Sequence, residues 1–222
     1  MDLISLFNES NYLLTDINEF LEGVKRKFYD AKQKEGKSEN EIRQAWVSFM
    51  GHNLEGIFEL FLKAFCNKHN LKLTKDKWLR KKELPKELSE VKRKISVNFG
   101  KYMLLPDADL IIYKTNPVEI LFIFSIKNSF RERYTETPYW KLKLLQDDVT
   151  KHIKVFLITP DKDNEISFDK PKKARIVLEY ELDGIYLAKD VFDKSEKIKS
   201  IMDLIDDLER YLKEFNERLK DC

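Results

Sequence analysis

Cysteine, glycine and proline are all scarce in this chain of 222 residues. The two cysteines, Cys66 and Cys222, are too few for a disulfide framework or a cysteine-based zinc site. Six glycines and six prolines are too few for a long flexible linker or a low-complexity tail. The composition therefore predicts a single folded domain over residues 1–222.

A long apolar run and a strong charge of one sign are also missing. No segment approaches the roughly 20 apolar residues of a membrane span, and the opening MDLISLFNES lacks the basic and apolar regions of a signal peptide. We therefore expect a cytoplasmic protein without membrane contacts. The net charge is only +2, from 41 basic and 39 acidic residues, so a nucleic-acid surface would require local clustering of charge.

Apolar residues at helical spacing predict a mainly helical part over residues 1–70. One amphipathic helix is expected over about residues 13–34 and a longer one from about Glu39, with a break at KEGKSEN between them. The basic segment that follows is expected to be a loop with a short helix. Residues 195–222 have the spacing of a C-terminal helix packed on one side.

From about Ile95 the apolar residues follow the period of strands. SVNFGKYMLL, ADLIIY and EILFIFSIK predict three strands, a helix is expected over about residues 137–151, and KVFLITP, RIVLEYEL and GIYLA predict further strands. This order predicts an α/β fold with a mixed central sheet flanked by helices. The catalytic sheet core would occupy residues 95–190.

Two aspartates stand before one of these strands, and a lysine ends the next. Alternate residues of a strand share a face, so Asp107 and Asp109 are expected to point the same way. Lys127 follows an apolar run, where a charge is costly unless it is compensated or used. If the strands are neighbours, these groups meet at one end of the sheet. Carboxylates there could hold Mg²⁺, and the lysine could orient or deprotonate the water that attacks a phosphodiester.

The alternative is that the Pro-Asp pair is a simple turn and that the lysine only reaches solvent. Of the two aspartates, Asp109 is the favoured ligand because it directly begins the apolar strand LIIY.

A further carboxylate is expected from the long N-terminal helix. Glu55 lies between Gly51 and Gly56, and glycine inside a helix costs about 1 kcal/mol relative to alanine, which indicates close approach by backbone or ligand. An exposed glutamate paired with a lysine is the alternative. Glu59, one turn later, and Glu136 are the other acids that could complete the site.

PDAD at residues 106–109 and SIK at residues 125–127 resemble the signature of the PD-(D/E)XK nucleases, and the expected element order matches the core of that fold. The resemblance implies a restriction-endonuclease-like fold and cleavage of DNA that depends on Mg²⁺. It also implies a set of site residues: catalytic Asp109, Lys127, Glu55 and Ser125, and metal-binding Asp109, Glu55, Asp107 and Ile126.

Ser125 is a departure from the common pattern, which has an acid at this position. A serine at this position resembles the restriction endonucleases that carry the missing acid on a nearby helix. At the corresponding place this chain has Trp140 and Lys141. Glu55 is therefore the preferred candidate for the missing ligand.

The segment NSFRERY follows Lys127 and carries an Arg-acid-Arg triplet. An arginine fork matches O6 and N7 of guanine, and a carboxylate can accept from N4 of cytosine. We therefore expect DNA contacts from Asn128, Arg131, Glu132 and Arg133. The triplet resembles the one that follows the catalytic lysine in restriction endonucleases for CCGG-type or interrupted CC/GG sites. A solvated loop with an internal ion pair is the alternative.

The basic segment after the N-terminal helices is a second candidate DNA surface. Lys77, Arg80 and Lys81 are expected to contact phosphates, with Trp78 among them. A solvated charged face is the alternative.

Together these features predict a type II restriction endonuclease that cuts double-stranded DNA at a short, palindromic site. A two-fold DNA site is matched by two-fold protein symmetry, so a homodimer is expected. The alternatives are a structure-specific nuclease of the junction-resolving or repair type, and a DNA-binding protein without catalysis.

Overall fold

The computed structural model describes residues 2–10, 12–130, 134–168, 170 and 172–218. Within them the main sheet has the strand order β1-β4-β5-β6-β7-β8. Strand β4 is antiparallel to both of its neighbours, and β5 to β8 run parallel to one another. The strands are β1 Lys72–Thr74, β4 Leu110–Lys114, β5 Glu119–Ile126, β6 Lys154–Thr159, β7 Gly184–Leu187 and β8 Ile198–Ser200. The predicted mixed central sheet is confirmed.

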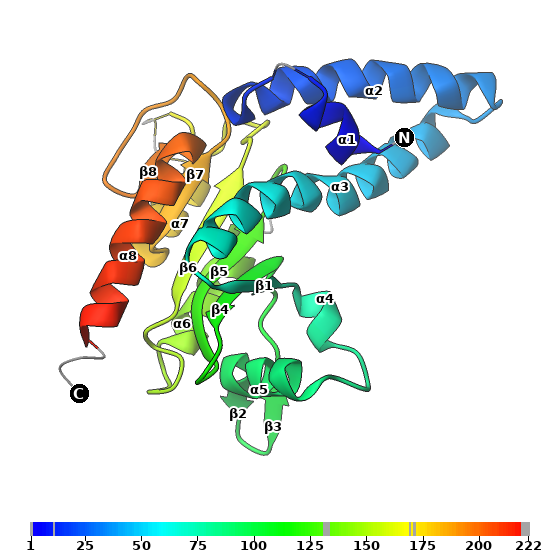
Figure 1. Ribbon diagram of the computed structural model, residues 1–222. Coiled ribbons are helices and arrows are strands. Elements are labelled where there is room, and N and C mark those ends of the chain that lie inside the picture. Colours follow the sequence, from blue (N-terminus) through cyan, green and yellow to red (C-terminus); the bar gives the residue numbers. More distant parts are fainter. Residues whose placement is uncertain (1, 11, 131–133, 169, 171, 219–222) are drawn as a thin grey trace.

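One face of this sheet is covered by the N-terminal helices and the last helix, as Figure 1 shows. Apolar residues of β4, β5 and β6, such as Leu110, Phe124 and Phe156, pack against them in one buried cluster. The elements of this layer are α1 Leu3–Asn8, η1 Leu14–Asp16, α2 Ile17–Lys34, α3 Glu39–Lys68, η3 Ile201–Asp203 and α8 Leu204–Arg218.

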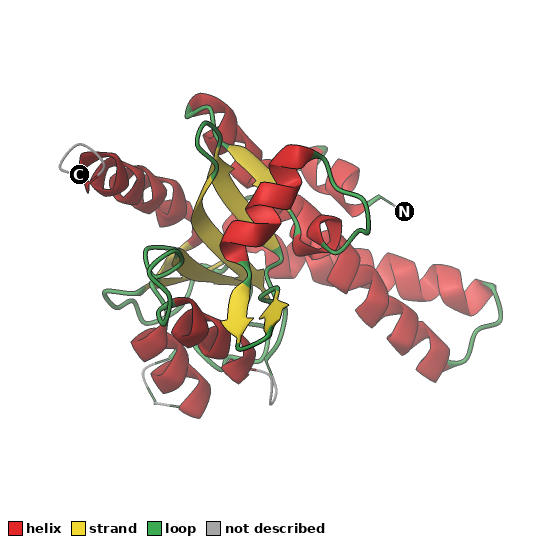
Figure 2. Cartoon of the chain, turned by 90° about the horizontal axis from the view of Figure 1, so that it is seen from below, coloured by secondary structure: helices red, strands yellow, loops and turns green. Residues whose placement is uncertain are grey.

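The opposite face carries a second apolar cluster, in which Ile123, Val155 and Ile185 of the sheet are buried. Its covering elements are α4 Asp76–Leu79, α5 Lys86–Ile95, α6 Glu136–Leu144, α7 Lys173–Glu181 and a small hairpin of β2 Val97–Phe99 and β3 Tyr102–Leu104. Because both faces are packed, β4, β5 and β6 are almost entirely buried. Figure 2, seen from below, shows the sheet between these layers.

The two long helices α2 and α3 form a hairpin that extends beyond the sheet (Figures 1 and 2). Ser38 caps α3 by accepting from the N–H of Glu41, while the Glu41 side chain accepts from the N–H of Ser38. The break expected at KEGKSEN is thereby confirmed. No helix among the described residues is both long enough and apolar enough to cross a membrane.

A β-bulge modifies the central hairpin. Ile112 pairs with Phe122 but Tyr113 pairs with Ile120, so Leu121 is the extra residue of β5. Strict alternation predicts that Leu121 shares a face with Ile123. Instead Leu121 packs with Phe122 in the cluster beneath α3, and Ile120 lies in the other cluster. The alternation expected from the sequence holds only after the bulge.

Within residues 95–182, three sequence predictions of local structure are wrong. RIVLEYEL is largely the helix α7, because burial of Ala174 and Leu178 one turn apart outweighs its β-branched residues. SVNFGKYMLL is a hairpin with a two-residue turn, in which Gly100 has a φ of +71°. The helix from Glu136 ends at Leu144, whose carbonyl accepts from the Thr150 hydroxyl at 2.6 Å.

The sheet also extends beyond the expected core of residues 95–190. Strand β1 was missed because it has only three residues and lies in a basic segment. The C-terminal segment expected as one helix begins with β8 and η3 before α8 starts at Leu204.

Candidate active site

The acid and the lysine predicted from the sequence meet at one edge of the sheet. Chain direction explains this, because β4 begins at the edge where its neighbour β5 ends. The N–H of Asp109 donates to the Phe124 carbonyl at 3.0 Å, and the N–H of Lys127 donates to the Ile158 carbonyl at 3.1 Å. These bonds continue the ladders of the sheet by one step, so the backbone of both residues is fixed.

The two side chains form a loose ion pair. The Lys127 Nζ lies 3.7 Å from Oδ2 of Asp109, and the side chains are only 19% and 24% exposed. The same Oδ2 accepts from the N–H of Ile126 at 2.5 Å. Burial raises the pKa of the Asp109 carboxyl, while the charge of Lys127 and the amide of Ile126 oppose that rise. The nearby positive charge therefore does not fully compensate for the hydration that the Asp109 carboxylate loses on burial.

Helix α3 adds Glu55 to this edge. Burial raises the pKa of Glu55, and the next largest cause is repulsion from the charge of Asp109, so the two carboxylates are electrostatic neighbours. The adjacent Gly56 has a different role, because a Cβ there would lie 2.5 Å from Cδ1 of Ile4. The close approach indicated by this glycine is the packing of α1 on α3.

The β1–α4 connection contributes Asp76, which sequence reasoning missed, and Lys75, which the sequence suggests only as one of the phosphate contacts of the basic segment. Lys75 is buried, with its Nζ 2.7 Å from Oε2 of Glu59 and 3.8 Å from Oε2 of Glu55. The charge of Asp76 also raises the pKa values of Asp109 and Glu55, although burial is the larger cause for each. The only signal in the sequence was the Lys-Asp-Lys triplet after β1, which reads as part of a solvated basic run.

This donor set fits a hard divalent cation. The part of the chain that the structure describes contains no group of three or more His, Cys, Asp or Glu residues that could hold a metal ion by themselves. Mg²⁺ is commonly bound through one or two carboxylates, with water and substrate phosphate oxygens as the remaining ligands. Asp109 and Glu55 are the two neighbouring, incompletely neutralised carboxylates that such a site needs.

Asp107 lies outside this group. It lies two residues further from β4 than Asp109 does, and its side chain is 61% exposed. Its carboxylate accepts from Arg80 at 3.0 Å and from the Trp140 indole at 3.3 Å. Arg80 also contacts Asp76, so this predicted phosphate-binding arginine bridges two carboxylates in the DNA-free chain.

Helix α6, where the resemblance stated above implies a migrated acid, has Lys141 turned into the interior. Its Nζ donates to Asp183 at 2.5 Å and to the Ile153 carbonyl at 3.1 Å. Glu136 is the first residue of the helix and is half-buried. Ser125 is buried in β5, between Phe124 and Ile126.

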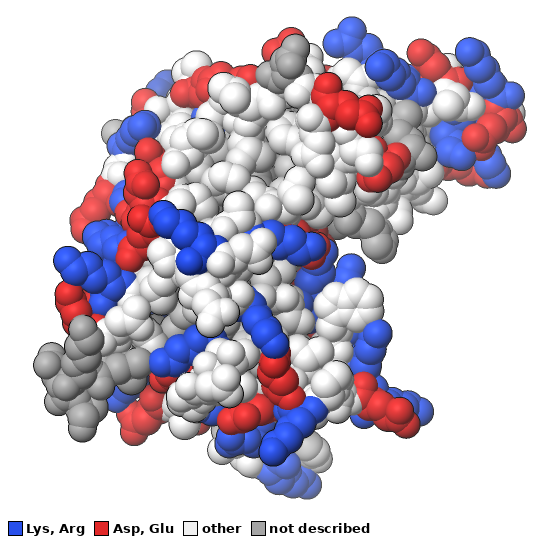
Figure 3. Space-filling view, viewed as in Figure 1, with Lys and Arg blue, Asp and Glu red and all other residues white. Residues whose placement is uncertain are grey.

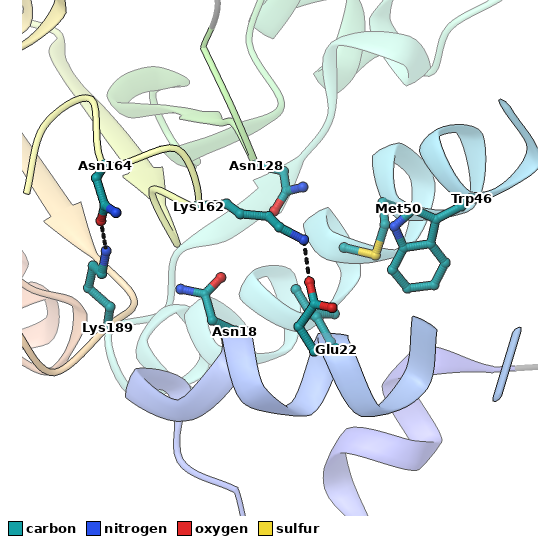
Figure 4. Close-up of a pocket in the computed structure, with 9 residues that line it drawn as sticks. Asn18, Glu22, Trp46, Met50, Asn128, Lys162, Asn164 and Lys189 are labelled. Atoms are coloured by element: carbon teal, nitrogen blue, oxygen red, sulfur yellow. Dashed lines mark hydrogen bonds and ion pairs between the residues drawn. The ribbon is translucent and has the colours of Figure 1, made fainter. Parts of the chain in front are cut away.

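The predicted base-reading triplet, Arg131 to Arg133, lies outside the described residues. Asn128 is described, and its side-chain oxygen is buried without a hydrogen-bond partner among the described residues. It lines a cavity of about 260 Å³ between α2, α3 and the loops after β5, β6 and β7. Figure 4 shows Lys162 and Lys189 in the same cavity, paired with Glu22 and Asn164.

Lys77 and Lys81 both lie near the exposed Trp78 ring, with their ammonium groups 5.8 and 4.1 Å from its centroid. Helix α4, which contains Lys77 and is followed by Lys81, borders a hollow of the molecular surface (Figure 3). In Figure 3 this hollow lies between the layer of α1 to α3 and the part formed by α4, α5 and the β2–β3 hairpin. The ion pairs of Lys75 join the two sides of this hollow, from the β1–α4 connection to α3.

An acid and a lysine on neighbouring strands, with a glutamate from the preceding helix, define the class of PD-(D/E)XK-like nucleases. Residues 87–207 match the family model "BsaWI restriction endonuclease type 2". The chain belongs to this family of restriction endonucleases, and the predicted type II restriction endonuclease is confirmed.

Two relatives are similar over most of their length. The "Putative type II restriction enzyme MjaVIP" of Methanocaldococcus jannaschii is 51% identical over 175 residues, which cover 76% of this chain and 77% of the relative. The "Probable type II restriction enzyme HpyAORF263P" of Helicobacter pylori is 60% identical over 146 residues, or 64% of this chain and 75% of the relative. Among solved structures, the complex of the restriction endonuclease PspGI with substrate DNA has a TM-score of 0.49 at 16% identity, over 89% of this chain and 74% of that one.

Proposed function

We propose that this chain hydrolyses phosphodiester bonds of double-stranded DNA at a short specific sequence in a reaction that requires Mg²⁺. The observation that carries the proposal is the pair of Asp109 and Lys127 at 3.7 Å on neighbouring strands, with Glu55 close enough to Asp109 for the charge of Asp109 to raise its pKa after the larger effect of burial. Membership of a restriction endonuclease family supports the same chemistry. Asp109 and Glu55 hold the metal, and Ile126 is the proposed main-chain ligand between Ser125 and Lys127.

Each protein group has a separate task in this reaction. A bound divalent ion supplies Lewis-acid stabilisation of charge on the phosphate and lowers the pKa of water. The Ile126 amide fixes the orientation of the Asp109 carboxylate. Lys127 orients the attacking water as an ammonium or, in its neutral amine form, accepts the proton of that water. Ser125 takes the place of an acid without adding charge, which leaves Glu55 as the second carboxylate.

DNA recognition is assigned to the basic segment around α4 and, from the sequence alone, to the segment that follows Lys127. Lys77 and Lys81 are suited to phosphates, because phosphate contacts give affinity without sequence choice. Arg131, Glu132 and Arg133 follow the catalytic lysine closely and carry the groups that read G·C pairs. A palindromic site presents this surface twice, so the active form is proposed to be a homodimer in which each copy cuts one strand.

The test is cleavage of plasmid and bacteriophage DNA by the purified protein with Mg²⁺. Discrete fragments that disappear in EDTA, and in the variants Asp109→Asn and Lys127→Met, are the expected result. A smear would show nuclease activity without sequence choice. Cutting of branched DNA with none of linear DNA would favour the structure-specific alternative, and intact DNA with every divalent metal would contradict the enzyme.

A further inference from the structure

Lys75 lies at the site as a counterpart to Lys127. Strand β1 pairs with β4 on the side opposite to β5, and both β1 and β5 end at the edge where β4 begins. The N–H of Asp76 donates to the Ala108 carbonyl at 3.3 Å, which holds the end of β1 beside Asp109. One lysine therefore follows the strand on each side of Asp109.

The ammonium group of Lys75 is buried and paired with carboxylates of α3. Only 8% of the residue is exposed. Because lysine is almost never buried without a charged partner, this burial indicates that the ammonium group is paired. Its Nζ contacts Glu59 at 2.7 Å and Glu55 at 3.8 Å. These glutamates are one turn apart on α3, where two like charges repel each other. The ammonium lies against both carboxylates.

Among the described residues, carboxylates outnumber the cations that are shielded from solvent at this edge. Glu55, Glu59, Asp76 and Asp109 bring four negative charges, and Lys75 and Lys127 offset two of them. The other two cations, Lys63 and Arg80, are exposed side chains that contact Glu59 and Asp76 from the solvent side. A site of this charge attracts a divalent cation and repels a DNA phosphate. A fixed ammonium next to the metal ligand weakens both effects.

We propose that Lys75 is a positioning residue that acts through Glu55 and Glu59 as a fixed cation, so that the site admits a DNA phosphate before the metal is bound. This inference rests on the proposed function, because it assumes that Glu55 and Asp109 bind a divalent ion. It makes a prediction that a purely structural ion pair does not make: removal of the charge changes the affinities for metal and for DNA in opposite directions.

Two binding measurements test this. Calorimetric titration with Mn²⁺ in the absence of DNA gives the metal affinity, and fluorescence anisotropy of a labelled duplex in EDTA gives the metal-free DNA affinity. Lys75→Met should bind Mn²⁺ about tenfold more tightly, the Coulomb effect in water of a unit charge roughly 6 Å from a divalent ion. It should bind the duplex about threefold more weakly, because one positive charge near a phosphate is lost.

Matched variants separate charge from structure. Lys75→Arg retains the charge and should keep both affinities close to those of the wild type. Lys141→Met removes another buried lysine that is paired with a carboxylate, at the opposite end of the sheet, and should change neither affinity. If Lys75→Met does not fold, Glu59→Gln removes one of the negative charges instead and should strengthen DNA binding in EDTA. No change in DNA affinity for Glu59→Gln would then overturn the proposal.

The possible failures are distinct. If the wild type cuts DNA and binds Mn²⁺ but Lys75→Met has unchanged affinities, or loses both together, Lys75 is a structural ion pair and only this inference is wrong. If the wild type neither cuts DNA nor binds Mn²⁺, the proposed function is wrong and the inference is overturned with it.

Discussion

Each end of the central sheet holds lysines and carboxylates that are largely shielded from solvent. The two groups differ in how many short hydrogen bonds the central carboxylate accepts. At the end away from the candidate site, the Asp183 carboxylate accepts from Lys141 at 2.5 Å, from the Val155 N–H at 2.8 Å and from Lys154 at 3.2 Å. At the site, Asp109 has one short bond, from Ile126, and its lysine lies 3.7 Å away.

This difference separates a structural network from a functional one. Donors surround the Asp183 carboxylate, so it needs no further ligand. The pKa values of Asp109 and Glu55 are raised chiefly by burial, because the nearby positive charge does not fully replace their lost hydration. A site that is destabilised in this way is suited to an added cation.

The largest effect is expected from Asp109→Asn, which removes the central carboxylate. Cleavage should fall by about a thousandfold or more, since loss of metal-assisted charge stabilisation costs several kcal/mol. Thermal stability of the metal-free protein should rise, because a poorly compensated buried charge is removed. Plasmid cleavage and thermal unfolding measure the two quantities. A variant that retains more than a tenth of the activity would place the metal elsewhere.

The matching change at the other end is Asp183→Asn. It leaves Lys141 buried without its carboxylate, and removal of one partner from a buried pair costs about 3–5 kcal/mol. Urea unfolding should show this loss, while cleavage per folded molecule stays near the wild-type value. Loss of activity with intact stability would contradict a purely structural role for this network.

The pH dependence of stability gives a smaller effect. A carboxyl with a raised folded-state pKa binds protons more strongly in the folded than in the unfolded chain, so it favours folding at acidic pH. The wild type should therefore lose stability relative to Asp109→Asn as the pH rises above 3.8, the ordinary pKa of the group, through its raised value. Thermal unfolding of both proteins in EDTA measures this difference. A difference that shrinks with rising pH would contradict the environment described for Asp109.

The smallest effect is expected from Asp107→Asn. This carboxylate is exposed and engaged with Arg80 and Trp140, and exposed ion pairs contribute at most about 1 kcal/mol. Cleavage should change by less than about threefold. A loss comparable to that of Asp109→Asn would make Asp107 a metal ligand after all.

The sequence was most informative where local pattern and chemistry agreed. The long apolar strand before Lys127 and the acid at the start of the preceding strand predicted which elements would meet. The break before Glu39, where Ser38 caps the next helix, predicted that a long helix begins there and contains Glu55.

Other features depend on tertiary contacts that leave little trace in a sequence. Strand β1 is three residues long, and only its pairing with β4 makes Lys75 a neighbour of Asp109. The bulge at Leu121 and the helical state of RIVLEYEL follow from packing on the sheet. Asp107 and Asp109 look equivalent by spacing, yet their surroundings differ, because the Asp109 N–H is bonded to the Phe124 carbonyl of β5 and the Asp107 side chain is exposed.

The most direct test of the account is a crystal structure of the protein with a DNA duplex and Mn²⁺, with the metal located by anomalous scattering. The account predicts a peak that is coordinated by carboxylate oxygens of both Asp109 and Glu55, with Lys127 beside the scissile phosphate. A metal bound by Glu136 or Asp107, with Asp109 free of metal, would contradict it.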